Sequence, residues 1–416
     1  MSDRKADIDA VTEAAKKTTP EDRAETTGLM EPLLIGESSR QRGALSDLAV
    51  ELASKSAGFR RSLPEGVMSA LADLVRAMNC YYSNLIEGHD THPIDIERAL
   101  KNDYSTDAKK RDLQLEAKAH IAVQKWIDNG GLKARPTNSD ALLEIHRRFC
   151  ELLPEDLLWV TEPNTGERLR VVPGELRLRY VKIGQHIAIS PGAVPRFLQR
   201  LESAYGNLGR TDAILASAAA HHRFAWIHPF LDGNGRVARL MSHAMLLHAL
   251  ETGSVWSISR GLARNVDTYK RLLSDADLPR RNDLDGRGTL SEEALAEFTK
   301  FFLTTCIDQV TFMEGLVEPN RLRARILMWV EEEVRLEKLL PQSGAVLEAV
   351  LFRGELPRGD VGALLGKSDR QARRIVQSLS EHNVIVSEGP RDPLRLAFPA
   401  TLASRWMPGL FPERSG

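Results

Sequence analysis

The stretch from His228 to Leu240 reads HPFLDGNGRVARL and gathers residue types that act on phosphates. Gly233 and Gly235 lack the Cβ atoms that would keep a phosphate away from backbone amides. Arg236 and Arg239 are three residues apart, so on a helix they share one face and can hold a polyphosphate. A helix that begins near Arg236 would add the positive end of its dipole.

Two further side chains in this stretch could supply catalysis. Asp232 offers the hard carboxylate oxygen that suits Mg²⁺ against substrate phosphates. His228 precedes a rigid proline and, with a pKa near the working pH, could accept a proton from an incoming hydroxyl. Each residue alone is ordinary, and neither a Walker A loop nor a GxGxxG fingerprint is present. The ordered string as a whole predicts a nucleotide phosphate site with a general base beside it.

The string resembles the HPFxDGNGRxxR signature of the Fic family at every fixed position, and the similarity extends over about residues 65–310. The resemblance implies a mostly helical domain that transfers AMP from ATP, with Mg²⁺, to a Ser, Thr or Tyr hydroxyl of a target protein or of the chain itself. Kinase-like relatives carry a bulky basic residue where Gly235 stands here, which favours AMP transfer. The implied roles are base for His228, Mg²⁺ ligand for Asp232, and phosphate binding for Gly233, Asn234, Gly235, Arg236 and Arg239.

A second stretch, SNLIEG from Ser83 to Gly88, resembles the inhibitory motif [ST]xxxE[GN] of the same family. The resemblance implies that Glu87 pairs with Arg239, which then cannot hold the γ-phosphate. A carboxylate in an anion site neutralises the cation and repels the phosphate. The alternative, without an inhibitory role, is a solvated glutamate near a helix end. The same glutamate could instead position a water for AMP removal, so a de-AMPylating or bifunctional enzyme stays open.

Residues 156–190 alternate β-branched and polar residues between glycines and prolines, which predicts a β-hairpin region. By resemblance, the hairpin at about Tyr180–Ile189 would be a flap that pairs with an extended target segment. Its docking residues would be Val181, Lys182, Ile183 and Gly184, although an ordinary surface hairpin is the alternative. Tyr269 is a further candidate, for packing the adenine.

The C-terminal part of the chain predicts a smaller domain. LPRGDVGALLGKSDRQARRIV reads as helix, tight turn and helix, and Ser368 with Gln371 makes a capping-box start for the second helix. Two short strands around a Gly-Pro turn follow. This order is that of a winged helix-turn-helix.

The second helix of that unit carries Arg370, Arg373 and Arg374, the strongest local basic patch for nucleic acid. Acidic neighbours dilute the patch, and winged helices also bind proteins. A DNA-binding regulator whose Fic domain senses a nucleotide is therefore an alternative of another class. It would depend on these arginines and tolerate loss of His228.

Hydrophobic periodicity places the motifs on a mainly α framework, with helices over Gly66–Glu87, Ala213–Trp226 and Arg236–Leu250. The predicted fold is a Fic-type helical domain with a β-hairpin flap, plus a C-terminal winged helix-turn-helix. We expect a mobile N-terminal tail over residues 1–40, a helical region carrying the inhibitory helix over 41–130, a Fic core over 131–315, a linker helix over 316–340, and the winged helix-turn-helix over 341–416.

Composition narrows the class of protein. The formal net charge is −1, so no overall field attracts nucleic acid or an anionic membrane. The three cysteines lie far apart without CxxC spacing, which indicates buried thiols rather than a zinc site or disulfides. No apolar run approaches the ~20 residues of a membrane span, and the polar N-terminus lacks a signal-peptide core. We expect a cytoplasmic protein without a membrane partner, and the sequence leaves a homodimer open.

Overall fold

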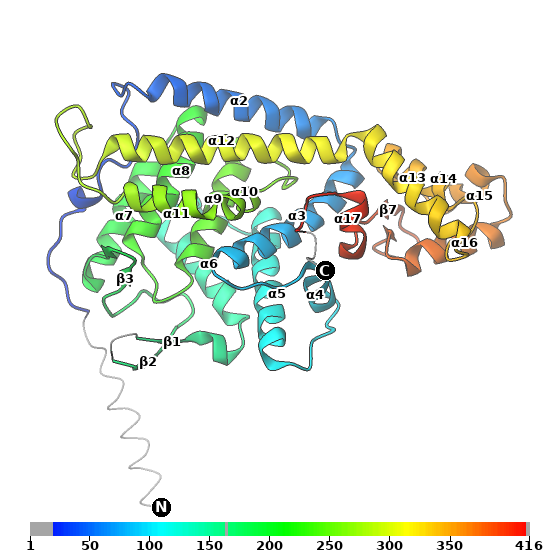
Figure 1. Cartoon of the computed structure of the whole chain (residues 1–416), viewed down its shortest axis with the longest axis horizontal. Coiled ribbons are helices and arrows are strands. Elements are labelled where there is room, and N and C mark those ends of the chain that lie inside the picture. Colours follow the sequence, from blue (N-terminus) through cyan, green and yellow to red (C-terminus); the bar gives the residue numbers. More distant parts are fainter. Residues whose placement is uncertain (1–19, 163–164, 413–416) are drawn as a thin grey trace, which may run out of the picture.

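A computed structural model describes residues 20–162 and 165–412 as a mainly helical molecule with three small antiparallel sheets (Figure 1). The mainly α fold class is therefore confirmed. None of the helices in these two ranges is long and apolar enough to cross a membrane.

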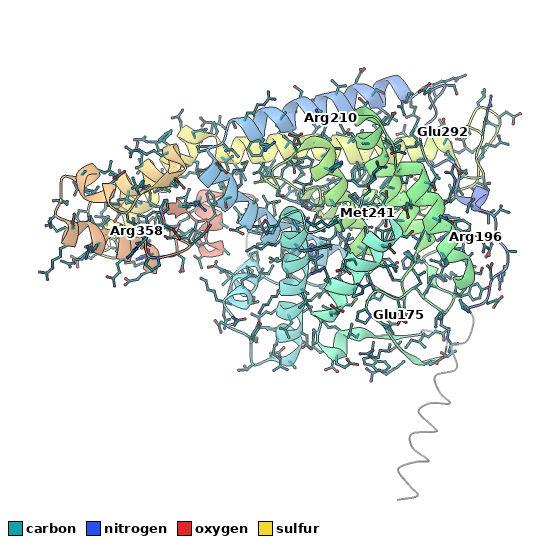
Figure 2. The ribbon with its side chains drawn as sticks, turned by 180° about the vertical axis from the view of Figure 1, so that it is seen from behind. Glu175, Arg196, Arg210, Met241, Glu292 and Arg358 are labelled. Atoms are coloured by element: carbon teal, nitrogen blue, oxygen red, sulfur yellow. The ribbon has the colours of Figure 1, made fainter. Side chains whose placement is uncertain are left out.

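The main body packs its other helices beneath α2 (Arg42–Arg61) and α12 (Glu292–Val317). These two helices lie side by side along one edge, blue and yellow in Figure 1. Helix α8 (Arg210–Ile227) packs against both and against α9 (Asn234–Leu250), whose Met241 is fully buried in the middle of the body (Figure 2). The other helices of this body are α3 (Glu65–Ile86), α4 (Pro93–Leu100), α5 (Ala108–Asp128), α6 (Ser139–Glu151), α7 (Val194–Tyr205), α10 (Ser259–Arg264) and α11 (Val266–Asp275).

Local chemistry sets the helix ends. Asp107 accepts a hydrogen bond from the backbone amide of Lys110, which caps the start of α5. Ser291 caps α12 in the same way through the amide of Ala294. Gly88 has φ +87 directly after Glu87, so α3 ends in the left-handed conformation that glycine adopts without strain.

Two short hairpins interrupt the helices between α6 and α7. Strand β1 (Trp159–Thr161) pairs with β2 (Arg168–Arg170), and β3 (Lys182–Ile183) pairs with β4 (His186–Ile187). Both lie within the segment predicted to be β, and the second lies where the hairpin was expected. The β insertion is therefore confirmed.

The N-terminal tail prediction is wrong for residues 20–40. The composition of this segment is polar overall, but Met30, Leu33 and Ile35 are almost completely buried in the core. Tyr205 donates a hydrogen bond to the Leu33 carbonyl at 2.7 Å, and Arg200 forms an ion pair with Glu31. A few apolar anchors and ion pairs are enough to hold this segment against α7. The rest of the predicted tail, residues 1–19, lies outside the described residues.

The C-terminal part is a smaller unit at one end of the molecule, where Figure 2 labels Arg358. Helix α13 (Pro319–Arg335), which follows α12 directly, falls within the predicted linker. Ser368 and Gln371 form the predicted capping box at the start of α16. The strands form one antiparallel sheet in the order β5–β7–β6. Along the chain the unit contains α14 (Ser343–Arg353), β5 (Glu355–Leu356), α15 (Asp360–Leu365), α16 (Asp369–Glu381), β6 (Ile385–Val386), β7 (Leu394–Leu396) and α17 (Ala403–Trp406).

The end of the chain returns to α3. The Tyr82 hydroxyl donates a hydrogen bond to the Leu410 carbonyl at 2.9 Å, and Arg260 donates to the Gly409 carbonyl at 2.8 Å. The Phe411 ring stacks on Tyr82 with ring centroids 6.5 Å apart. The C-terminal unit therefore packs on the helix that leads to Glu87.

The contact between α3 and the C-terminal unit predicts a stability effect. A Cβ added at Gly66 would collide with the backbone carbonyl of Gly354, which cannot rotate away as a side chain could. Gly66→Ala is expected to lower the free energy of unfolding by about 2 kcal/mol, in the range of core overpacking. Gly58→Ala is the matched control, since nothing lies within 4 Å of its added Cβ and alanine favours the helix. Equal melting temperatures for the two variants would contradict the close packing.

Candidate active site

The predicted signature loop connects α8 to α9. His228 is the C-cap of α8, in the left-handed conformation with φ 49 and ψ 63. Gly233 is the N-cap of α9 with φ 82, a backbone conformation that favours glycine. The first backbone amides of α9 have no partner within the helix and form a natural anion site.

The side chain of Asn234 closes this loop. Its Oδ1 accepts a hydrogen bond from the Phe230 amide at 2.9 Å, and its Nδ2 donates to the Phe230 carbonyl at 2.8 Å. The side chain is buried and both of its polar atoms are used. These hydrogen bonds shape the loop and leave the second Nδ2 hydrogen over, so the role of Asn234 in phosphate binding stays a prediction.

His146, on α6, supports the loop from behind and was not predicted. Its Nδ1 accepts a hydrogen bond from the Gly174 amide at 2.9 Å, so its Nε2 carries the proton and donates to the Asp232 carbonyl at 3.2 Å. Its ring stacks on Phe230 at 3.8 Å between centroids. Burial lowers the pKa of His146 to about 4, so the ring is neutral near pH 7.

His228 is half-buried, and the hydrogen-bond partner of Nδ1 shows which ring nitrogen carries the proton. Nδ1 lies 3.3 Å from the Ala225 carbonyl, which can only accept, so Nδ1 carries the proton. Nε2 is then the free acceptor, as a general base requires. Burial lowers the pKa of His228 to about 4, below the value near neutrality expected from the sequence. The ring is therefore neutral and able to accept a proton throughout the neutral pH range.

Asp232, the predicted metal ligand, is open to solvent. Its side chain is 50% exposed, and one carboxylate oxygen lies 3.9 Å from the Arg236 guanidinium. No group of three or more His, Cys, Asp or Glu side chains arranged for a metal exists in the described ranges. A single carboxylate still fits Mg²⁺, which is commonly held by one or two carboxylates together with substrate phosphates and water.

Arg239 is held by the stretch predicted to inhibit it. Its side chain is 2% exposed, and its guanidinium lies 2.5 Å from the Glu87 carboxylate. It also donates to the Ser83 hydroxyl at 2.8 Å and to the Ser83 carbonyl at 3.2 Å. The structure thus brings together Ser83, Glu87 and Arg239, as the sequence predicted.

The Glu87 carboxylate lies over the first turn of α9. A Cβ added at Gly235 would collide with Glu87 Oε1, so the carboxylate fills the space that the missing side chain leaves open. Burial alone would raise the pKa of Glu87, but the charges of Arg239 and Arg236 outweigh it and lower the pKa. An ionised carboxylate therefore occupies the place where a phosphate would meet the helix N-terminus.

The first arginine of the signature is also paired, with a residue that was not predicted. Arg236 lies 2.5 Å from Glu116 of α5, whose side chain is 1% exposed. The other oxygen of Glu116 lies 2.7 Å from Nδ1 of His89, two residues beyond Glu87. Both arginines expected to hold phosphates therefore face carboxylates.

Tyr269 is enclosed by helices in the neighbourhood of Arg239 and Glu87. It is 4% exposed, and its hydroxyl lies 2.7 Å from Nε2 of His221 inside the helical body. Its ring packs against Phe298 at 6.5 Å between centroids. The prediction that Tyr269 packs the adenine is wrong, because the neighbouring helices enclose the ring.

The predicted flap residues lie on the β3–β4 hairpin or directly before it. Lys182 and Ile183 form the exposed strand β3, Val181 precedes it, and Gly184 makes the turn with φ 59. His186 of β4 contacts the Trp226 carbonyl at 2.8 Å, which fixes the hairpin to the end of α8. The hairpin therefore lies beside the residues that lead into His228.

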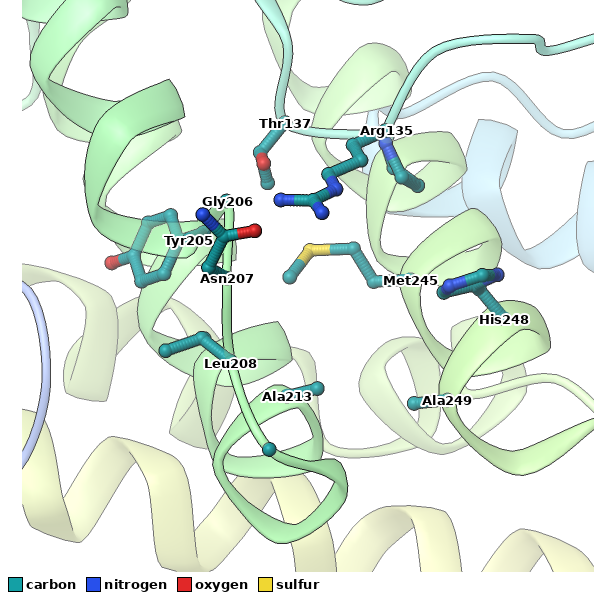
Figure 3. Close-up of a pocket in the computed structure, with 12 residues that line it drawn as sticks. Arg135, Thr137, Tyr205, Gly206, Asn207, Leu208, Ala213, Met245, His248 and Ala249 are labelled. Atoms are coloured by element: carbon teal, nitrogen blue, oxygen red, sulfur yellow. The ribbon is translucent and has the colours of Figure 1, made fainter.

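A separate pocket of about 460 Å³ lies elsewhere on α9 (Figure 3). It is lined by Met245 and His248 from the C-terminal half of α9, and by Arg135 and Thr137 from the segment before α6. The signature residues are at the N-terminus of the same helix. This pocket is therefore distinct from the site around His228.

The basic patch predicted in the C-terminal unit is exposed. Arg370, Arg373 and Arg374 project from α16, whose opposite face is buried. None of the three forms an ion pair with a residue in the described ranges. They are free to meet an anionic partner.

Part of the chain is similar to a known protein family. The model of the Fic/DOC family matches residues 136–246, which include the loop from His228 to Arg239. Protein adenylyltransferase Fic of Drosophila melanogaster is 28% identical over 171 residues, 41% of this chain and 32% of the relative. The protein of the same name from Drosophila willistoni is 28% identical over 173 residues, 41% of this chain and 31% of the relative. The chain thus spans about a third of the length of these curated relatives.

A solved structure extends the likeness of fold. A Fic family protein from Desulfovibrio desulfuricans G20 aligns with a TM-score of 0.51 and 18% identity, over 88% of this chain and 98% of that one. At this identity the likeness concerns the fold alone. The residues that match the Fic/DOC family model include α8, the loop from His228 and most of α9. The similarity to the Fic/DOC family is thus strongest over residues 136–246.

Proposed function

We propose that this protein transfers AMP from ATP to a Ser, Thr or Tyr hydroxyl of a target protein, and that Glu87 inhibits the reaction. The observation that carries the proposal is the arrangement around α9. A neutral His228 with a free Nε2 lies in the same loop as Asp232, the helix N-terminus and two buried arginines. The names of the Drosophila relatives, protein adenylyltransferase Fic, support it.

The reaction needs one proton acceptor and one anion site. The hydroxyl oxygen of the target bonds to the α-phosphorus, and the bond from that phosphorus to the bridging oxygen breaks. The hydroxyl proton passes to Nε2 of His228, and pyrophosphate leaves. The α9 amides, Arg236 and Arg239 would hold the phosphates, so catalysis rests on positioning and charge stabilisation.

Magnesium is the cofactor that the residues fit. Asp232 would hold it at the exposed side of the loop, and the bound ion would neutralise charge on the phosphate oxygens. The buried arginines would neutralise the remaining negative charge of the triphosphate. This division leaves His228 free for the proton.

Removal of Asp232's charge provides a test of this assignment. In a Glu87→Gly background, Asp232→Asn is expected to raise the Mg²⁺ concentration for half-maximal rate by about tenfold or more, since the amide is a weaker ligand. Asp283→Asn is the matched control, because that carboxylate is fully exposed in the loop before α12. An unchanged Mg²⁺ dependence in Asp232→Asn would remove Asp232 from the metal site.

Inhibition follows from where Glu87 lies. Its carboxylate pairs with Arg239 and covers Gly235, so a phosphate would have to displace it or bind in another position. A phosphate that cannot reach Arg239 leaves the α-phosphorus misaligned for attack. The wild-type protein, with Glu87 in place, is therefore expected to have low transfer activity.

The β3–β4 hairpin is the proposed docking site for the target segment. Its edge is exposed, and Ile183 and Ile187 present apolar side chains that are 38% and 66% exposed. An extended segment could add as a further strand and bring its hydroxyl toward His228.

Two alternatives keep specific support. The Glu87 side chain is 32% exposed, so it could position a water for the reverse removal of AMP. The C-terminal unit has the element order of a winged helix, and α16 presents its three arginines to solvent. A regulator that binds DNA through α16 would therefore need these arginines rather than His228.

Labelled ATP separates these functions. Purified Glu87→Gly protein is incubated with Mg²⁺, a cell lysate, and ATP labelled with ³²P at either the α or the γ position. Protein label from the α position only supports AMP transfer. Label from the γ position that appears only when the purified protein is added would identify a kinase, and added label from neither position would favour AMP removal or the DNA-binding regulator.

A further inference from the structure

The loop before the hairpin contains a buried arginine with an unusual set of partners. Arg177 is 2% exposed, yet it forms no ion pair with any carboxylate in the described residues. Its guanidinium donates to four backbone carbonyls instead. They belong to His228 at 2.7 Å, Ile189 at 2.7 Å, Arg179 at 2.9 Å and Ile227 at 3.4 Å.

These carbonyls belong to two structures that must cooperate. Ile227 and His228 are at the C-terminal end of α8, where backbone carbonyls have no partner within the helix. Arg179 precedes strand β3 and Ile189 follows strand β4, so both stems of the hairpin bind the same guanidinium. One planar side chain thus joins the stems of the hairpin to the backbone of the general base.

Neighbouring contacts complete the connection. The backbone amide of Arg177 donates to the Pro229 carbonyl at 3.0 Å, and His186 of the hairpin contacts the Trp226 carbonyl at 2.8 Å. Four consecutive carbonyls, from Trp226 to Pro229, are therefore satisfied by the segment from Arg177 to His186. The left-handed backbone of His228 lies inside this set, and such a conformation persists only where its surroundings fix it.

We propose that Arg177 is a positioning residue for the transfer reaction, which fixes the orientation of His228 and couples it to the hairpin where the target docks. The proposal rests on AMP transfer as the function of the site. Its consequence is that docking of a target segment on β3 or β4 changes the orientation of His228 through the contacts of Arg177 and His186. Arg177 itself touches neither the proton nor the phosphate.

Charge gives Arg177 a second effect on His228. The charged groups that face His228 are Arg177, His186 and Asp232, of which the first two lower its pKa and Asp232 raises it. Burial is the largest cause of the low pKa, and the Arg177 charge adds to it. Because the base acts in its neutral form, the rate is lost as the pH falls through this pKa. Loss of the Arg177 charge would raise the pKa and move the acid limb to higher pH.

The test compares three variants in the Glu87→Gly background. Arg177→Met removes the charge and the hydrogen bonds, whereas Arg177→Lys keeps the charge and loses the planar fork. Arg179→Met is the matched control, because its side chain is exposed in the same loop and pairs only with exposed Glu167. The measurements are the single-turnover rate of label transfer across pH, the affinity for ATP, and the pKa of His228 from an NMR titration assigned with His228→Ala.

Arg177→Met is expected to lower the transfer rate by about 100-fold, the cost of a small misplacement of reacting groups, with ATP affinity unchanged within about twofold. Its acid limb and the pKa of His228 should move to higher pH, while both stay in place in Arg177→Lys and Arg179→Met. A transfer rate within about threefold of the parent would overturn the proposal. So would an unmoved pKa of His228 together with parallel losses of rate and ATP affinity, which indicate a structural role only.

The two proposals can fail separately. A parent protein that transfers no AMP overturns the proposed function, and the NMR titration of His228 then decides the role of Arg177 alone. If Arg177→Met does not fold, Arg177→Lys carries the test. A lysine that restores the parent rate in full would exclude a role for the fork.

Discussion

Replacement of Glu87 by glycine is expected to raise the rate of AMP transfer by about 100-fold, which corresponds to about 2.7 kcal/mol of activation free energy. The carboxylate lies 2.5 Å from the Arg239 guanidinium and covers Gly235. A carboxylate and a phosphate oxygen about 4 Å apart repel by about 4 kcal/mol at the effective dielectric near a protein surface. The expected gain is therefore within what removal of this charge can supply. The measurement is the initial rate of α-³²P incorporation.

Two controls separate charge from helix geometry. Glu87→Gln keeps the size of the side chain and is expected to give part of the activation. Glu381→Gly places glycine at the end of α16 in the C-terminal unit, where the glutamate is exposed, and should leave the rate unchanged. Equal rates for Glu87→Gly and the wild type would mean that the ion pair with Arg239 does not restrain the site.

Replacement of His228 by alanine should remove transfer, by about 10³-fold in the Glu87→Gly background, within the usual range for general-base catalysis. The free Nε2 is the acceptor for the hydroxyl proton. Nδ1 already carries a proton, and the stretch from His228 to Arg239 contains one histidine. ATP affinity should stay within about twofold, because the phosphates bind the α9 amides and the arginines.

The control for this variant lies on the same helix. His248→Ala removes an exposed histidine from the pocket at the other end of α9, and should leave transfer unchanged. Residual transfer within about tenfold of the parent in His228→Ala would show that His228 is not the general base.

The loop from His228 to Arg239 could be predicted because its chemistry is contiguous in the sequence. The pair of Glu87 and Arg239 spans 152 residues and was predicted only through a family motif. The ion pair between them is present, and its inhibitory effect stays a prediction. Local periodicity also placed α3, α8 and α9 correctly, because each carries apolar residues at helical spacing.

The supporting residues could not be predicted in the same way. His146, Glu116 and Arg177 are single polar residues in segments with ordinary patterns, and only tertiary packing brings them to the loop. Their hydrogen bonds go to backbone atoms or to another helix, for which the sequence carries no local sign. The sequence also does not show which side chains are buried. For this reason it predicts too high a pKa for His228 and places Tyr269 in contact with the adenine.

Intact mass spectrometry of the purified protein tests the central claim most directly, with the chain itself supplied as the target. Wild type, Glu87→Gly and Glu87→Gly/His228→Ala are each incubated with ATP and Mg²⁺. The account predicts an added mass of one or more AMP groups on Glu87→Gly, little on the wild type and none on the double variant. An added phosphate, or added AMP that is independent of both Glu87 and His228, would contradict it.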